Sequence, residues 1–303
     1  MSITDKSYEA HSKTYANVNK ENAELWTNEG TVDYWRHERM YNTLLPILNN
    51  YKNGKWVTIG DGKYGTDAHF LLKHTPNVLP TDIAEDCLKM AKEAGFIPDY
   101  RIENAEHLTF SDNEFDFALV KEAYHHFPRP AIAVYEMLRV SQKAIVLIEP
   151  NDPNCQSPQR FSFNQSLFWL VNSIKNSIKK LLGKEVYYSL GGYEEVGNFV
   201  YTISEREIEK IALGLNYDLV AFKGLNDDYI AGVETEKLAD KGPLFQKISK
   251  SIEKEDRKEK AGKRSWGIFT AVIFKEMPNE NCIKDMEKAG FKITKLMKNP
   301  YLK

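Results

Sequence analysis

Three glycines stand close together where an apolar run gives way to a loop, in the sequence WVTIGDGKYGTD. They are Gly60, Gly62 and Gly65. Glycines at a turn between a strand and a helix let the backbone come close to a nucleotide-like ligand. Asp82 follows 22 residues after Gly60 and ends a second apolar run, and an acid at that place accepts hydrogen bonds from ribose hydroxyls. The spacing predicts an adenosine cofactor, and it leaves NAD(P) open as one candidate.

Two adjacent histidines, His125 and His126, follow a later apolar run in the sequence KEAYHHFPRP. A neutral imidazole accepts a proton near pH 7, so one of the two is a candidate general base, with Glu122 as the second choice. The alternative is structural: one imidazole caps the following helix, and the other is buried and hydrogen-bonded. The sequence leaves both interpretations open.

Composition and charge narrow the class of protein. The 303 residues include 41 Lys and Arg against 43 Asp and Glu, so no overall charge attracts nucleic acid. Cys87, Cys155 and Cys282 are far apart and form no CxxC pair, which argues against a disulfide framework or a structural zinc site. The first residues lack the apolar core of a signal peptide, and no stretch approaches the ~20 apolar residues of a membrane-spanning helix. We therefore expect a cytoplasmic protein without a transmembrane segment.

Short apolar runs alternate with helical patterns through much of the chain. Seven runs are expected strands: residues 56–60, 77–81, 100–103, 115–121, 143–149, 218–222 and 266–274. Helical patterns cover residues 65–73, 84–95 and 130–140, and a capping-box sequence at Ser204 begins a further helix. This alternation predicts an α/β fold with a doubly wound, mostly parallel seven-stranded sheet and helices on both faces.

The order of these elements divides the chain into three parts. Residues 1–50 form a helical N-terminal extension, residues 51–275 form the domain built on the sheet, and residues 276–303 form a tail with one short helix. Two stretches, residues 151–201 and 226–263, interrupt the alternation and are expected to be insertions.

Over residues 55–150 the order of these motifs resembles the class I S-adenosylmethionine-dependent methyltransferases. The resemblance implies S-adenosylmethionine as the cofactor and an antiparallel last strand at residues 266–274. It places Gly60, Asp61, Gly62 and Gly65 in the loop at the methionine end of the cofactor. It assigns the ribose to Asp82, the adenine face to Ile83, the adenine edge to Asn104 and Ala105, and the place beside the methyl donor to Lys121. Thr58 stands where the family usually has an acid, and Asp61 is the residue that could replace its charge.

The same resemblance gives the candidate bases a role. His125 or His126, or else Glu122, would remove the proton of an acceptor hydroxyl. A metal ion is not expected, because adjacent histidines lack the i,i+4 spacing with which two imidazoles share an ion on one helix. Asp116, Glu149 and Asp152, which could otherwise hold a divalent ion, are interpreted as ordinary acids at the ends of strands.

The first insertion, residues 151–201, gives an indication of the molecule that accepts the methyl group. Residues 153–184 contain no acid and five basic residues, with apolar residues at helical spacing. We expect a lid packed over the core, although such a helix can also contact the surface of an anionic membrane. Residues 193–199 resemble a segment of methyltransferases from bacterial surface-sugar gene clusters, and on this resemblance Glu195 and Asn198 would contact acceptor hydroxyls.

The predicted function is therefore O-methylation of a sugar or glycan intermediate of polysaccharide biosynthesis by an S-adenosylmethionine-dependent methyltransferase. An NAD(P)-dependent oxidoreductase that uses the same glycine loop is the alternative from another class, but it would need an acid for hydride transfer, and no Tyr-x-x-x-Lys pair is seen in the usual place. The sequence is also compatible with a methyltransferase of a non-sugar small molecule, or with a cofactor-binding protein that performs no chemistry.

Overall fold

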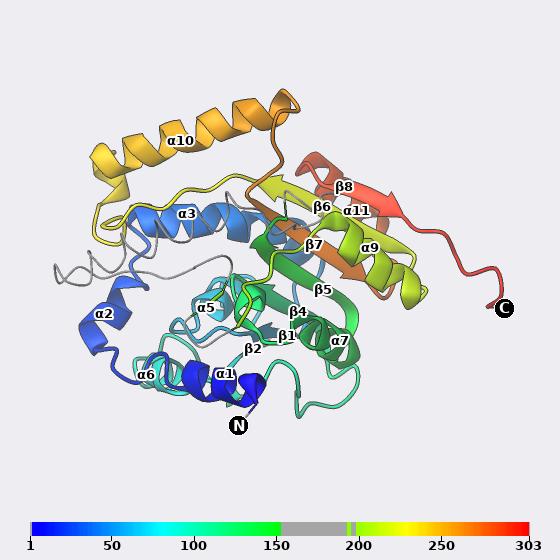
Figure 1. The fold of residues 1–303 in the computed structure, drawn as a ribbon, viewed down its shortest axis with the longest axis horizontal. Coiled ribbons are helices and arrows are strands. Elements are labelled where there is room, and N and C mark those ends of the chain that lie inside the picture. Colours follow the sequence, from blue (N-terminus) through cyan, green and yellow to red (C-terminus); the bar gives the residue numbers. More distant parts are fainter. Residues whose placement is uncertain (1, 153–192, 195–197, 303) are drawn as a thin grey trace, which may run out of the picture.

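The computed structural model describes residues 2–152, 193–194 and 198–302 (Figure 1). Within these ranges eight strands form one sheet in the order β3-β2-β1-β4-β5-β7-β6-β8. The strands are β1 (Trp56–Ile59), β2 (Val78–Asp82), β3 (Arg101–Ile102), β4 (Phe115–Lys121), β5 (Ser141–Pro150), β6 (Leu219–Leu225), β7 (Ile268–Phe274) and β8 (Lys292–Lys295).

The first five strands along the chain are parallel. β1 pairs with β2 on one side and with β4 on the other, β3 extends the sheet beyond β2, and β5 lies beside β4. The carboxyl ends of these strands therefore meet at one edge, which is where open α/β sheets bind their ligands.

The other half of the sheet is antiparallel. β7 runs antiparallel to both β5 and β6, and β8 runs antiparallel to β6. The expected mostly parallel sheet and the antiparallel strand within residues 266–274 are thus confirmed, whereas the expected number of seven strands is too low. The additional strand, β8, is short and none of its residues is buried. Its sequence, KITK, therefore does not show the continuous apolar run by which a core strand is recognised.

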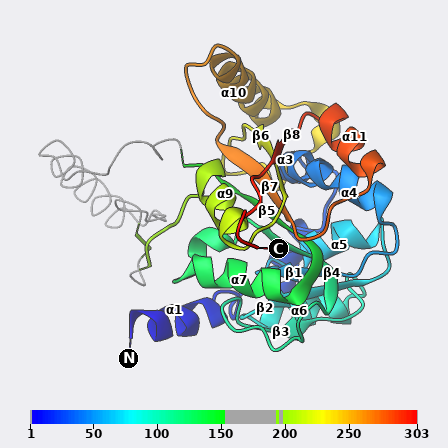
Figure 2. The ribbon, with the colours of Figure 1, turned by 90° about the vertical axis from the view of Figure 1, so that its right-hand side faces the viewer.

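Two cores lie on opposite faces of the sheet (Figure 2). Alternate residues of β5 point into them: Val146 packs in one core, and the next residue, Leu147, packs in the other. The first core also receives helices α4 (Leu45–Asn50), α5 (Thr66–Leu72) and α11 (Glu280–Lys288), and the second receives α7 (Pro130–Val140) and α9 (Glu205–Gly214). Because both faces are covered, the inner strands are continuous apolar runs.

The remaining helices of the described ranges are α1 (Ile3–Ser12), α2 (Lys20–Leu25), α3 (Val32–Tyr41), α6 (Asp86–Glu93), α10 (Pro243–Lys260) and the 3-10 helices Asn42–Leu44, Tyr124–His126 and Leu238–Asp240. Residues of α1, α2 and α3 lie at the edge where the parallel strands end. The long helix α10 lies in the second insertion and packs on α3 through a small apolar cluster that includes Val32, Ile248 and Ile252. In the described part of the chain, no helix combines the length and the apolar character that crossing a membrane requires.

An ion-pair group fastens α3 to the segment that follows β6. The guanidinium of Arg36 donates to Asp33 Oδ1 at 2.7 Å and pairs with Asp227, whose Oδ1 accepts from Arg36 Nε at 3.2 Å. The side chains of Arg36 and Asp227 are only 7% and 6% exposed. Loss of either carboxylate would therefore leave the mostly buried positive charge of Arg36 only partly neutralised.

Asp227→Ala is expected to lower the free energy of unfolding by about 3 kcal/mol, because it leaves the mostly buried Arg36 guanidinium with Asp33 in place of two carboxylates. Lys284→Ala is the control, because it removes an exposed ion pair with Glu280 on α11, and such a pair contributes about 0.2–1 kcal/mol. Urea denaturation followed by circular dichroism measures both. Equal effects of the two substitutions would contradict the importance of the buried group.

Candidate active site

The glycine loop lies tightly against the neighbouring strand ends. Gly60 has a φ of +75°, and a Cβ atom there would lie 2.5 Å from the Cβ of Ala123. A Cβ on Gly62 would lie 2.7 Å from the carboxylate of Asp82 and 2.8 Å from the ring of Tyr15. The backbone N–H of Gly62 donates to Asp82 Oδ2 at 2.8 Å. Only glycine allows this approach, and the contact joins the loop to the end of β2.

The carboxylate of Asp61 holds the turn from β1 into α5. It accepts hydrogen bonds from the hydroxyl of Thr58 at 2.8 Å and from the backbone N–H groups of Asp67 and Ala68 at 3.1 and 2.9 Å. Burial and the nearby charge of Asp67 raise the pKa of Asp61, while these hydrogen bonds oppose the rise. Thr58 and Asp61 therefore act together in this protein: the hydroxyl at the end of the strand supports the acid in the loop.

Asp82 lies at the end of β2 and, like Asp61, lines a cavity at the carboxyl ends of the strands. Its two oxygens accept the backbone N–H groups of Ala84 at 2.7 Å and Gly62 at 2.8 Å. Burial raises the pKa of Asp82, and the hydrogen bonds from these N–H groups counteract the shift. A carboxylate offers about four acceptor positions, so the side chain retains capacity to accept hydrogen bonds from ligand hydroxyls.

Charged groups gather at the end of β4. Lys121 Nζ lies 3.6 Å from Asp67 Oδ1 and 3.1 Å from Glu122 Oε2, and His37 Nδ1 lies 3.3 Å from the same Glu122 oxygen. Burial would lower the pKa of Lys121, but Asp67, Tyr41 and Glu122 hold it well above the usual value. Burial would raise the pKa of Glu122, but Lys121 and His37 keep it well below. The pair is therefore ionised near neutral pH, and Glu122 serves as the partner of Lys121.

His125 is held by a buried carboxylate. Its Nδ1 lies 2.7 Å from Glu149 Oε2, and Glu149 Oε1 accepts the backbone N–H groups of Ala123 at 2.8 Å and Tyr124 at 2.9 Å. Glu149 is completely buried. Burial lowers the pKa of His125, but the hydrogen bond and the charge of Glu149 outweigh this, so that the net shift is upward. Such a carboxylate fixes which ring nitrogen carries the proton and how the imidazole is oriented.

His126 points toward α1. Its Nδ1 contacts Glu194 Oε1, and the second oxygen of Glu194 lies 3.4 Å from His11 Nε2. Burial alone would raise the pKa of Glu194, but His11 and His126 lower it to about 2. Asn198 joins this group from the side: its Nδ2 donates to the hydroxyl of Ser7 at 2.6 Å and to the backbone oxygen of His126 at 2.9 Å.

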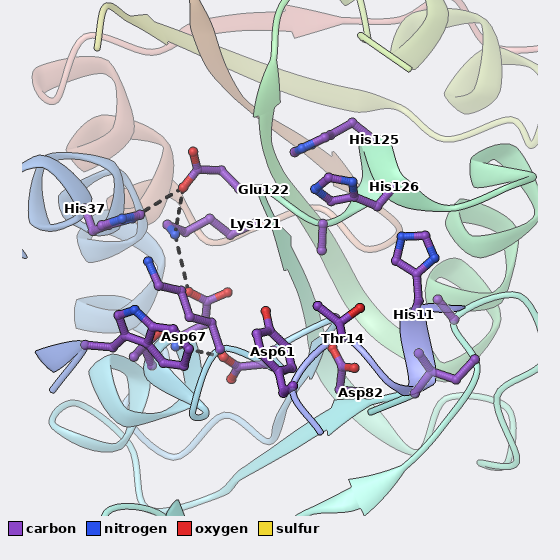
Figure 3. Close-up of a pocket in the computed structure, with 18 of the residues that line it drawn as sticks. His11, Thr14, His37, Asp61, Asp67, Asp82, Lys121, Glu122, His125 and His126 are labelled. Atoms are coloured by element: carbon purple, nitrogen blue, oxygen red, sulfur yellow. Dashed lines mark hydrogen bonds and ion pairs between the residues drawn. The ribbon is translucent and has the colours of Figure 1, made fainter. Parts of the chain in front are cut away.

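These groups surround one cavity of about 1030 Å³ at the carboxyl ends of the strands (Figure 3). The residues predicted from the sequence that line it are Gly60, Asp61, Asp82, Ile83, Asn104, Ala105, Lys121, Glu122, His125 and His126. Three others, Gly62, Gly65 and Asn198, are placed next to it without lining it. Glu195 and the predicted lid at residues 153–184 lie outside the described residues.

Part of one wall of the cavity was not predicted: it comes from the end of α1 and includes His11, Thr14 and Tyr15. Arg36 and His37 on α3 also line the cavity. The sequence of residues 34–37 is compatible with closing over a ligand, although docking of the helix by its aromatic residues is the favoured interpretation. The apolar spacing of α1 gives no indication of where the helix docks. The cluster of polar and aromatic residues between positions 7 and 15 was the only available signal.

Asp61→Ala is expected to lower the free energy of unfolding by about 1–2 kcal/mol, as for other helix-capping side chains, because it leaves two N–H groups at the start of α5 without acceptors. Asp86→Ala is the matched control: Asp86 is an exposed acid in the first turn of α6, and a change at such a surface position stays within about 0.5 kcal/mol. Guanidinium denaturation compares the two. A loss at Asp61 no larger than at Asp86 would contradict the capping role.

Comparison with solved structures returns methyltransferases of low sequence identity. A chain of the complex between the Haloferax volcanii Trm112 methyltransferase activator and a methyltransferase has 12% identity and a TM-score of 0.49, with 92% of this chain and 100% of that chain covered. YcgJ from Bacillus subtilis has 15% identity and a TM-score of 0.45, covering 78% and 99%. A SAM-dependent methyltransferase from Methanosarcina mazei has 18% identity and a TM-score of 0.42, covering 77% and 98%.

The family model described as a methyltransferase domain, Methyltransf_11, matches residues 57–148, whereas no curated protein sequence matches the chain. The matched residues run from β1 almost to the end of β5 and include the glycine loop, Asp82 and the end of β4. This match favours S-adenosylmethionine over a nicotinamide dinucleotide. The protein carries a methyltransferase domain and is an S-adenosylmethionine-dependent methyltransferase.

Proposed function

We propose that this methyltransferase transfers the methyl group to a hydroxyl of a sugar or glycan intermediate, and that His125 is the general base. The assignment of His125 as the base rests on its contact with Glu149. Glu149 is buried, is fixed by two backbone N–H groups and holds Nδ1 of the imidazole at 2.7 Å. Since His125 lines the cavity, its other ring nitrogen is the atom available to an acceptor.

The cofactor is proposed to lie along the ends of β1, β2 and β4. The close contact between Gly62 and Asp82 supports this, because it brings the glycine loop and the end of β2 together at the cavity. Asp82 would accept hydrogen bonds from the ribose hydroxyls, Ile83 would pack on adenine, and Asn104 with Ala105 would meet the adenine edge. Gly60, Asp61, Gly62 and Gly65 would form the loop at the methionine end, and Lys121 would stand beside the methyl donor.

The chemistry needs positioning and one proton acceptor. Bound S-adenosylmethionine would supply a methyl group on a positively charged sulfur, and in-line transfer would break the methyl–sulfur bond as the bond to the acceptor oxygen forms, leaving neutral S-adenosylhomocysteine. The unprotonated ring nitrogen of His125 would take the hydroxyl proton. Glu149 stabilises the imidazolium that results, as a buried carboxylate does for a catalytic histidine. Glu122 is less suited to this role, because Lys121 and His37 already occupy its carboxylate.

The choice of a hydroxyl rather than an amine acceptor follows from this base. An oxygen acceptor must lose its proton, and the oriented imidazole provides a place for it. The resemblance of residues 193–199 to a segment of surface-sugar methyltransferases supports a sugar or glycan. Glu195 and Asn198 are proposed to act at this acceptor. Asn198 Nδ2 already donates to Ser7 and to the His126 backbone, whereas Oδ1 is buried and has no hydrogen-bond partner among the described residues.

Asp82→Ala is expected to weaken the binding of S-adenosylhomocysteine about tenfold or more, because hydrogen bonds to a charged group are worth about 1.5–3 kcal/mol and 1.4 kcal/mol is tenfold in affinity. Isothermal titration calorimetry measures the affinity, and a thermal unfolding curve establishes that the variant is folded. Asp86→Ala, four residues further on, is the control and should bind normally. Full affinity in a folded Asp82→Ala variant would move the ribose site elsewhere.

His125→Ala is expected to reduce kcat about a hundredfold or more, in the range of general-base catalysis, while leaving S-adenosylhomocysteine affinity unchanged. The assay transfers a radiolabelled methyl group to a panel of sugars and glycan intermediates. Glu149→Gln should show a smaller loss, since it retains a side chain that can still contact the imidazole. His74→Ala is the control, because His74 lies just beyond α5 and does not line the cavity.

Two outcomes would overturn parts of this proposal separately. An unchanged rate in the His125→Ala variant would remove His125 as the base and leave the cofactor assignment intact. Methylation of amine or other non-sugar acceptors, with none of the hydroxyl acceptors in the panel modified, would overturn the proposed acceptor class.

A further inference from the structure

Three potential metal ligands from distant parts of the chain meet at one end of the cavity. They are His11 on α1, His126 after β4, and Glu194 in the described part of the first insertion. One ligand atom from each lies within 4.8 Å of the others. Figure 3 shows the imidazoles of His11 and His126 close to each other on the side of the cavity where Asp82 lies. No two of these residues share a helix, so the i,i+4 rule applied to the sequence could not detect them.

The contacts of His11 leave one nitrogen directed at the group. His11 Nδ1 lies 2.9 Å from the backbone oxygen of Ser7, and the neutral imidazole that donates this hydrogen bond has its lone pair on Nε2. A hydrogen bond from the other ring nitrogen to a backbone carbonyl is the usual support of a metal-binding histidine. His11 Nε2 lies 3.4 Å from Glu194 Oε2, and this oxygen is buried without a hydrogen-bond partner among the described residues.

The spacing suits a small divalent ion. Zinc binds imidazole nitrogen and carboxylate oxygen at about 2.0–2.2 Å in a tetrahedral arrangement, which places neighbouring ligand atoms roughly 3.3 Å apart. The contact between His11 and Glu194 is 3.4 Å. Two histidines and one glutamate are also a known donor set of catalytic zinc sites, in which the fourth position is open.

Asn198 holds the two histidine segments in place. Its Nδ2 donates at 2.6 Å to the hydroxyl of Ser7, one turn before His11 on α1, and at 2.9 Å to the backbone oxygen of His126. The side chain of Asn198 is buried. Asn198 therefore ties the part of α1 that carries His11 to the backbone of His126.

We propose that His11, His126 and Glu194 form a binding site for one divalent transition-metal ion, with Zn²⁺ as the ion that fits the donors. The site assembles only when α1 is docked beside the end of β4, so it joins the N-terminal extension to the methyltransferase domain. Because all three residues line the cavity, the remaining coordination positions are open to a molecule bound there. The metal site itself does not rest on the proposed function.

The test uses Zn²⁺ alone with the full chain, prepared without a histidine tag and stripped with a chelator. Competition with a chromophoric chelator is expected to give one Zn²⁺ per chain. His11→Ala, His126→Ala and Glu194→Gln should each weaken binding tenfold or more, in line with the loss of a ligand. His74→Ala is the control and should bind as the wild type does. Thermal unfolding of each variant establishes that it is folded.

A measurement on the wild type alone covers the case in which a variant fails to fold. The X-ray absorption spectrum of the Zn²⁺-loaded protein should show two imidazole ligands. Absence of stoichiometric binding, or a spectrum without imidazole, would overturn the site. The affinity of each variant for S-adenosylhomocysteine is measured in parallel. Glu194→Gln should weaken Zn²⁺ binding and leave this affinity unchanged, so a failure of the metal site is distinguishable from a failure of the proposed cofactor site.

Discussion

The relative positions of the glycine loop, Asp82 and Lys121 depend on how the chain turns from β1 into α5. The carboxylate of Asp61 fixes this turn by accepting hydrogen bonds from Thr58 and from the first N–H groups of α5. Once the turn is fixed, Gly62 reaches Asp82, and Asp67 at the start of α5 reaches Lys121. A single buried carboxylate thus sets the distances between the ends of three strands.

Much of the fold was predictable because the sheet is covered on both faces. Strands such as β4 and β5 are continuous apolar runs, and a run of that kind is recognisable without knowledge of its neighbours. β8 was missed for the opposite reason: it lies at the edge, and its four residues are exposed or half-buried. The helix α10 was likewise hidden in a charged stretch, since Ile248 and Ile252 are its only buried residues.

The candidate site was predictable where it depends on chain order and not where it depends on docking. Gly60, Asp82 and Lys121 follow strands of a parallel sheet, so their meeting at one edge follows from topology. The positions of His11 and Tyr15 depend on how α1 packs across that edge. No local pattern specifies this contact, because tertiary packing rather than helix propensity decides where an amphipathic helix is placed. The partner of His125, Glu149, lies on the neighbouring strand, and its local sequence does not indicate the contact.

The ion group at the end of β4 has a consequence for turnover. Asp67 and Glu122 together surround the one ammonium of Lys121, and burial with the charge of Lys121 lowers the pKa of His37, which favours its neutral form. These four side chains therefore carry a surplus negative charge. The sulfur of the proposed neighbouring cofactor is cationic before methyl transfer and neutral afterwards. In the proposed arrangement this negative charge would attract the reactant more than the product, so that the reaction itself would weaken the binding of the spent cofactor and favour its departure.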